Sequence, residues 1–185
     1  RVKAEGGTVR ANAVVVATNS PVNDRFVIHT KQAAYRTYVI GARLPAGSVP
    51  RALYWDTCED PASQSASGSP YHYVRLAGIP GTPGTELLIV GGGDHKTGQA
   101  HDAAKRFARL EAWTRERFPI DSIAYRWSGQ VMESVDSLAF IGRNPGDQNV
   151  FIATGDSGNG MTHGTIAGIL LSELVQGRDH DWLKL

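Results

Sequence analysis

The chain has 185 residues, of which 41% are apolar and 20% charged, a globular composition with enough residues for one large core or two smaller lobes. Its 19 basic and 18 acidic residues give a net charge of +1 without a run of like charges, which argues against nucleic acid or an anionic membrane as its partner. The single cysteine, Cys58, leaves no internal disulfide or thiolate metal cage, and no apolar stretch is long enough for a membrane span. We therefore expect a soluble, cytoplasmic protein.

The first part of the chain predicts a hairpin followed by a buried strand. The chain begins at Arg1 without a signal-peptide pattern, and we expect that the natural N terminus is missing. Residues 2–10 predict the hairpin, because its paired glycines supply the positive φ that a tight connection needs. The continuous β-branched run at 13–17 is typical of a strand with both faces covered.

The middle of the chain predicts a separate sheet and one helix. The strand signals lie at 33–44, 52–55, 71–76 and 87–90. The composition of 57–70, rich in serine, glycine and proline, predicts a mobile surface loop. The helix is expected at 99–117, and the apolar residues that share one of its faces are Ala103, Phe107, Leu110 and Trp113.

The last third predicts strands and a terminal helix. The strands are expected at 123–131, 138–141 and 149–154. The helix at 162–176 is apolar almost all round, which predicts a buried helix, and Gly177 stands at its C-terminal cap. The order of elements favours a split α+β architecture, in which one sheet takes strands from both chain ends and another sheet is inserted between them.

The most informative segment is the turn at 155–162, between a predicted buried strand and a predicted buried helix. Glycine lets the backbone approach a flat ligand closely. The first amides of a helix lack internal partners, and the helix dipole adds partial positive charge there, so this end holds an anion or an electron-rich carbonyl. The sequence therefore predicts a ligand site at this turn.

Three separated segments resemble the D-amino-acid-oxidase-like (DAO) FAD-dependent oxidoreductases. That family ends in a strand, a glycine-rich turn and a helix similar to residues 149–174. Its last flavin-domain strand before the substrate domain resembles 13–19, and its tryptophan-glycine to isoleucine-glycine stretch resembles 127–142. The resemblance covers nearly the whole chain, in matching order and spacing.

The resemblance implies FAD as the cofactor. Residues 1–30 and 143–185 would form part of a Rossmann-like FAD-binding domain, and 31–142 an inserted mixed or antiparallel β-sheet substrate domain. The N-terminal half with the dinucleotide fingerprint would be missing, so this fragment should bind FAD weakly and be inactive alone. The cofactor-binding residues implied are Ala17, Thr18, Trp127, Gly129, Gly155, Asp156, Gly158, Asn159, Gly160, Met161 and Thr162.

The reaction implied is hydride transfer from an amine or amino-acid-like substrate to the flavin, which needs a neutral amine and a well-placed carbon more than a protein base. No catalytic residue is therefore assigned. Many relatives carry a cation for the substrate carboxylate where this chain has Gly158, Thr162 and Val131. The cations of the inserted sheet that can replace it are Arg36, Arg75 and Lys96.

The expected substrate residues lie on two elements. Tyr73 and Arg75 share a face of one strand by period two, and His163 lies at the start of the last helix. We expect these three to line the substrate pocket. Ordinary packing is the alternative for each of them.

Other interpretations stay open. The turn can be a plain strand-to-helix connection, and its glycines approach a nicotinamide fingerprint, although the third, Gly164, comes one place late. Residues 91–94 fit either a strand end near the ligand or a turn. Residues 94–102 hold histidines and aspartates without a compact metal-binding spacing, so no metal is expected. The alternative function is a non-catalytic binding or regulatory module that retains the fold, motivated by the missing cations.

Overall fold

The computed structural model describes residues 1–23, 26–56 and 71–184. The chain divides into two compact units, each with a hydrophobic core of its own. Unit 1 comprises Arg1–Ala33 and Val131–Leu185, and unit 2 comprises Ala34–Gln130. The predicted loop at 57–70 lies outside the described residues. Within the described ranges, no helix combines the length and the hydropathy needed to cross a membrane.

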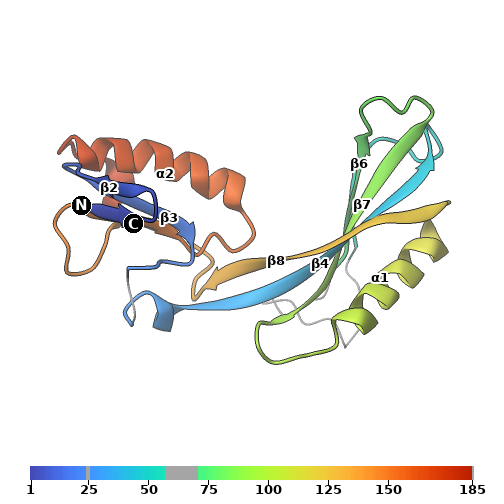
Figure 1. Ribbon diagram of the computed structural model, residues 1–185, viewed down its shortest axis with the longest axis horizontal. Coiled ribbons are helices and arrows are strands. Elements are labelled where there is room, and N and C mark those ends of the chain that lie inside the picture. The colour runs from blue at the N-terminus through green and yellow to red at the C-terminus, as the bar shows by residue number, and fades with distance from the viewer. Residues whose placement is uncertain (24–25, 57–70, 185) are drawn as a thin grey trace. The chain divides into compact units, whose positions relative to one another are not determined.

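The elements follow one another as Figure 1 shows. In chain order they are β1 (Val2–Ala4), β2 (Gly7–Val9), β3 (Val14–Asn19), a 3-10 turn η1 (His29–Lys31), β4 (Gln32–Pro45), β5 (Leu53–Trp55), β6 (Tyr73–Gly78), β7 (Thr85–Lys96), α1 (Ala103–Arg117), β8 (Ser122–Ser134), β9 (Phe140–Arg143), β10 (Val150–Thr154), α2 (Gly160–Val175) and η2 (Asp181–Lys184).

Unit 1 takes its sheet from both ends of the chain, as the order of elements predicts. The strand order is β3-β10-β9, with β3 parallel to β10 and β9 antiparallel to it. The predicted hairpin is confirmed, since β1 and β2 pair antiparallel. Helix α2 packs on this sheet through a small core that contains Phe151, Ala167 and Leu171. This arrangement places the carboxyl ends of β3 and β10 side by side, where Asn19 pairs with Thr154.

Two burial expectations are wrong for this chain. The strand predicted to be covered on both faces is β3, yet Val15 is 47% exposed, so the sheet face that carries Val15 is not covered. The last helix is not buried all round, since Ile169 and Val175 are 42% and 46% exposed. Its predicted end is confirmed: Gly177 has φ +70°, and its N–H donates to the Leu174 carbonyl.

Unit 2 is a five-stranded sheet with the order β5-β6-β7-β4-β8, covered on one face by α1. Alternate residues of β4 and β7 turn toward α1, where Leu110 is buried and Phe107 and Trp113 pack beside it. The predicted helix face is therefore confirmed for Phe107, Leu110 and Trp113 but not for Ala103, which is exposed at the start of α1. Helix α1 begins at Ala103 and not at 99. The largest fully buried side chains of this unit are Ile40, Leu44, Leu88, Val90 and Thr114.

Strand β7 runs well beyond the predicted 87–90 because its glycines continue the pairing through a bulge. Arg36 pairs with His95 and Tyr38 with Gly92, so two residues of β7, Gly93 and Asp94, lie opposite the single Thr37. Gly93 has φ +71°, the left-handed conformation common in such bulges. The bulge thereby places Asp94 opposite Thr37.

The units divide at 33/34 and 130/131, whereas the expected divisions were 30/31 and 142/143. The second differs because β9 pairs with β10 and thereby joins unit 1. The flavin and substrate roles of the two units stay predictions.

Candidate functional site

The turn between β10 and α2 needs glycine at two places. Gly155 has φ +73° and Gly158 has φ +77°, while Ser157 between them has φ 48°. A Cβ on Gly155 would also come within 3.0 Å of Gln32 Oε1. These residues therefore fix a tight backbone path between strand and helix.

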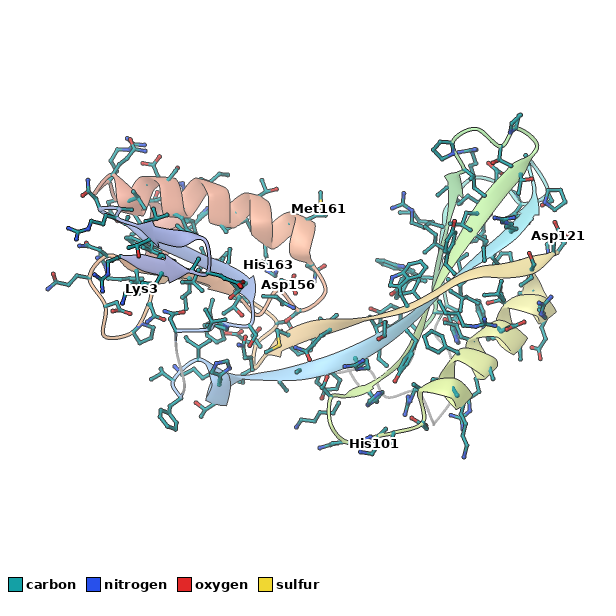
Figure 2. All side chains as sticks on the ribbon, viewed as in Figure 1. Lys3, His101, Asp121, Asp156, Met161 and His163 are labelled. Atoms are coloured by element: carbon teal, nitrogen blue, oxygen red, sulfur yellow. The ribbon has the colours of Figure 1, made fainter. Side chains whose placement is uncertain are left out.

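Asp156 organises this turn. Its Oδ1 accepts the Gly158 N–H at 3.3 Å, and its carbonyl accepts the Asn159 N–H at 2.8 Å. The same carbonyl lies 2.9 Å from His163 Nδ1, so one ring nitrogen of His163 is used locally. Figure 2 shows Asp156 and His163 together at the start of α2, with Met161 directed away from them.

Three polar residues that the sequence analysis did not single out hold this turn in place: Gln32, Ser134 and Thr154. Ser157 N–H donates to the Met132 carbonyl at 3.1 Å, and Ser157 Oγ lies 3.3 Å from Ser134 Oγ. Thr154 Oγ1 donates to the Asn19 carbonyl and lies 3.3 Å from Gln32 Oε1. Of these residues, only Thr154 could have been identified from the sequence, because it ends the strand predicted at 149–154.

The N terminus of α2 is open. Asn159 makes no capping hydrogen bond with its side chain, and Gly160, Met161 and Thr162 are exposed, Met161 at 90%. The first amides of a helix have no partner within it, so these donors and the positive end of the dipole are available. A Cβ on Gly158 would meet nothing within 4 Å. An uncapped helix end beside open space fits a planar ligand that has an acceptor edge.

The end of β3 lies at the same edge as this turn. Ala17 and Thr18 belong to the last three residues of β3, and Asn19 pairs with Thr154. The Thr18 hydroxyl donates to the Ser20 carbonyl at 2.7 Å. Ligands of open α/β sheets bind outside the carboxyl ends of parallel strands, and the structure brings Ala17 and Thr18 together with residues 155–162 at such an edge.

Unit 2 holds the other expected residues. Trp127 and Gly129 lie on β8, and a Cβ on Gly129 would come within 3.7 Å of Thr37. Arg36 donates to Ser128 Oγ at 3.2 Å. Tyr73 and Arg75 lie two residues apart on β6, with Arg75 exposed and Tyr73 half-buried.

Tyr73 belongs to a polar group that the sequence analysis did not assemble. Its hydroxyl lies 3.4 Å from Thr37 Oγ1, and the bulge of β7 places Asp94 opposite Thr37. Burial raises the pKa of Asp94 and that of Tyr73, and the Thr37 hydroxyl opposes both shifts. Asp94 Oδ1 is buried with no hydrogen-bond partner among the described residues.

The histidines and aspartates near this group do not form a metal site. Within the described ranges, no three metal-ligating side chains gather closely enough to hold an ion. His95 Nε2 lies 3.0 Å from the Tyr38 hydroxyl and its Nδ1 lies 2.9 Å from the Lys96 carbonyl. Lys96 itself is exposed.

A nicotinamide fingerprint is not supported at the turn. Gly164 lies inside α2, one place later than the third glycine of that motif.

Comparisons with known proteins point to the same family as the resemblance seen in the sequence. The family model for FAD dependent oxidoreductases (DAO) matches residues 1–174. The structure is similar to glycine oxidase from Geobacillus kaustophilus, with a TM-score of 0.66 and 17% identity over 96% of this chain and 45% of that one. It is also similar to iminodiacetate oxidase (IdaA) from Chelativorans sp. BNC1, with a TM-score of 0.61 and 14% identity over 96% of this chain and 46% of that one.

A curated relative matches a shorter stretch. The "Putative Rieske 2Fe-2S iron-sulfur protein YhfW" of Bacillus subtilis (strain 168) is 33% identical over 100 residues, which are 54% of this chain and 20% of that protein. The chain thus spans less than half of the solved structures above and aligns with about a fifth of this relative. Because the family model matches nearly the entire sequence, the chain belongs to the DAO family of FAD-dependent oxidoreductases.

Proposed function

We propose that this chain forms part of an enzyme that oxidises a small amine or amino-acid-like substrate with FAD. The observation that carries the proposal is the uncapped N terminus of α2, entered through a glycine turn at the shared end of β3 and β10. When bound, FAD supplies the hydride acceptor. The protein contributes backbone donors and an oriented dipole, which is worth about 0.3–2 kcal/mol and therefore tunes the cofactor more than it drives the reaction.

In this proposal the residues of the turn have different tasks. The exposed amides of Gly160, Met161 and Thr162 would hold the electron-rich edge of a bound flavin, where preorganised donors would stabilise added negative charge. Gly158 leaves room for close approach, since even a Cβ added there would have no atom within 4 Å. Asp156 holds the turn through the Gly158 amide.

The rest of the FAD site is assigned to a missing N-terminal half. Among the described strands β3 has one neighbour, β10, and parallel sheets normally have both faces covered. Val15 and Ile169 expose apolar surface on β3 and α2. A further parallel strand with its crossover helix would cover these surfaces and bring the phosphate-binding glycines. Alone, the chain is then expected to bind FAD weakly and to be inactive.

Flavin content of the full-length protein tests this function. We expect purified parent protein to carry FAD and to lose its flavin absorbance when an amine substrate is added without oxygen. A Cβ at Gly160 would lie 2.7 Å from Asp156 Oδ2, so Gly160→Val displaces the carboxylate that holds the turn and should strip the flavin. Gly164→Ala is the matched control, because a Cβ there meets nothing within 4 Å.

Two outcomes would count against the proposal. A parent protein free of flavin, and unresponsive to amines, would favour a non-catalytic module that retains the fold. Normal flavin content in the Gly160→Val protein would make the turn a purely structural connection.

A second candidate concerns where the electrons go next. The relative named for a Rieske 2Fe-2S centre favours an iron–sulfur protein or domain over oxygen as the acceptor. Under that proposal, reduced parent protein reoxidises slowly in air but rapidly with a one-electron acceptor such as ferricenium. Fast reoxidation by oxygen alone would contradict it.

A further inference from the structure

Unit 1 contains a pocket of about 470 Å³ between β9, α2 and η2. Its apolar walls come from all three elements: Phe140 lies on β9, Ile166 and Leu170 on α2, and Trp182 on η2. Small-molecule sites are typically pockets of roughly 300–1,000 Å³ with mainly apolar walls and a few polar groups. The pocket therefore has the size and the lining of a site for a small organic molecule.

This pocket differs from the proposed flavin site. None of the described residues that line it belongs to the turn at 155–162, and His163 is the first residue of α2 to reach it. Leu138 and Trp182 also line it and are 60% and 47% exposed, so part of its apolar lining is open to solvent. Apolar side chains gathered in this way at a solvent-exposed place are a feature of binding surfaces.

The polar side chains of the pocket offer hydrogen-bond acceptors. Asp136 is exposed, and its Oδ1 accepts the Leu138 N–H at 3.1 Å, which leaves most lone pairs of the carboxylate for a ligand. His163 Nδ1 lies 2.9 Å from the Asp156 carbonyl oxygen, which only accepts, so Nδ1 carries a proton. In the neutral ring, His163 Nε2 is then an acceptor. The described lining contains neither lysine nor arginine.

These features select a flat cation with N–H donors. A carboxylate without a lysine or arginine beside it favours a positive charge and disfavours an anion. Amidinium and guanidinium groups are planar, and their N–H donors match the two oxygens of a carboxylate. The face of an indole ring, here that of Trp182, attracts such a cation, and the apolar walls suit an attached aromatic ring.

His163 connects this pocket with the turn. The Asp156 carbonyl accepts the Asn159 N–H at 2.8 Å and lies against His163 Nδ1, and the Asn159 carbonyl accepts the His163 N–H at 2.9 Å. Figure 2 shows the Asp156 and His163 side chains together at the start of α2. A ligand that contacts the His163 ring therefore acts on the same carbonyl that holds the turn.

We propose that this pocket is an effector site for a small aryl amidinium or aryl guanidinium compound, whose binding acts on the turn through His163. The central carbon of either group bears no hydrogen, so such a ligand cannot give a hydride to flavin and is not the amine that is oxidised. The inference goes beyond the proposed function and does not require bound flavin.

Titration of the intact 185-residue chain with benzamidinium chloride tests the site. The matched probe is sodium benzoate, which has the same shape but a negative charge and acceptors in place of donors. Ionic strength is held constant, and the indole and amide signals of isotope-labelled chain are followed by NMR. We expect a saturable shift of the Trp182 indole signal with benzamidinium only, at a dissociation constant of about 1–10 mM, as for other ligands of this size. The other three tryptophans belong to unit 2 and should not respond.

Two variants separate the tasks of the polar residues. Asp136→Asn should weaken benzamidinium binding about two- to fivefold, since an exposed ion pair contributes little, and should narrow the difference from benzoate. Glu5→Gln is the matched control, because it removes a carboxylate at an exposed position of unit 1 outside the pocket lining. His163→Phe removes the hydrogen bond to Asp156, so at saturating benzamidinium the Asn159 amide signal should no longer shift while the Trp182 signal still does.

Several results would overturn the inference: equal binding of benzoate, a shift of all four tryptophan signals, no saturable shift, or undiminished binding by Asp136→Asn. The same titration is run on the parent protein. If the chain binds benzamidinium and the parent does not, residues of the parent fill the pocket and the effector site is refuted. A parent that binds benzamidinium but lacks flavin would retain this site and refute the proposed function alone.

Discussion

The ring of Tyr73 lies across Gly91, so closely that a Cβ on Gly91 would stand 2.2 Å from the Tyr73 hydroxyl oxygen. The two residues are direct partners in the pairing of β6 with β7. Gly91 has no positive φ and is therefore needed for space and not for its backbone conformation.

We expect Gly91→Ala to displace the Tyr73 ring. Inserting a methyl group where the space is filled costs about 1–3 kcal/mol of unfolding free energy, measured by urea denaturation. Gly78→Ala on β6 is the control, because a Cβ there meets nothing within 4 Å, and it should be neutral or slightly stabilising. Equal stability of the two variants would show that the ring moves aside without cost.

Asp94→Asn should stabilise the chain at neutral pH. Burial raises the pKa of Asp94 above the ordinary 3.8, so the folded state binds more protons than the unfolded state between the two values. The contribution of Asp94 to stability is therefore greatest below 3.8 and is lost as the pH rises through the folded-state pKa. Removing the charge should raise the thermal midpoint at neutral pH, and the gain should shrink in acid. If Asp94→Asn lowers the thermal midpoint at neutral pH, the surroundings stabilise the charged Asp94 carboxylate, which would contradict this prediction.

Arg106→Met should destabilise the chain strongly. Arg106 is 9% exposed, and removing its guanidinium leaves the Gly93 and Asp94 carbonyls and the Asp102 carboxylate without this donor. The expected loss is about 1–3 kcal/mol by urea unfolding, the cost of leaving backbone carbonyl acceptors without a donor. Arg109→Met, on an exposed position of the same helix, should change stability by less than about 0.5 kcal/mol. A small effect at both positions would mean that water replaces the Arg106 contacts.

Ile169→Ser should destabilise this chain and its proposed parent protein to different extents. Ile169 is 42% exposed here, so the substitution should cost the isolated chain less than about 1 kcal/mol. If a missing N-terminal half covers α2, the same change should cost the parent protein about 2–4 kcal/mol. The comparison uses thermal unfolding of both proteins, and equal losses would indicate that the parent leaves this side of α2 exposed.

Local sequence patterns were sufficient to identify most elements and the turn at 155–160. They were β-branched runs for β3 and β10, a one-sided apolar stripe for α1, and glycines where Gly155, Gly158 and Gly177 adopt positive φ. Which distant residues meet could be known only from the folded chain. Gln32 reaches Thr154 across 122 positions although their strands belong to different sheets. Thr37 meets Tyr73 across 36 positions because β4 and β6 both pair with β7. Burial depends on the same long-range pairing, since periodicity shows that β3 and α2 have apolar surface but not whether a neighbour covers it.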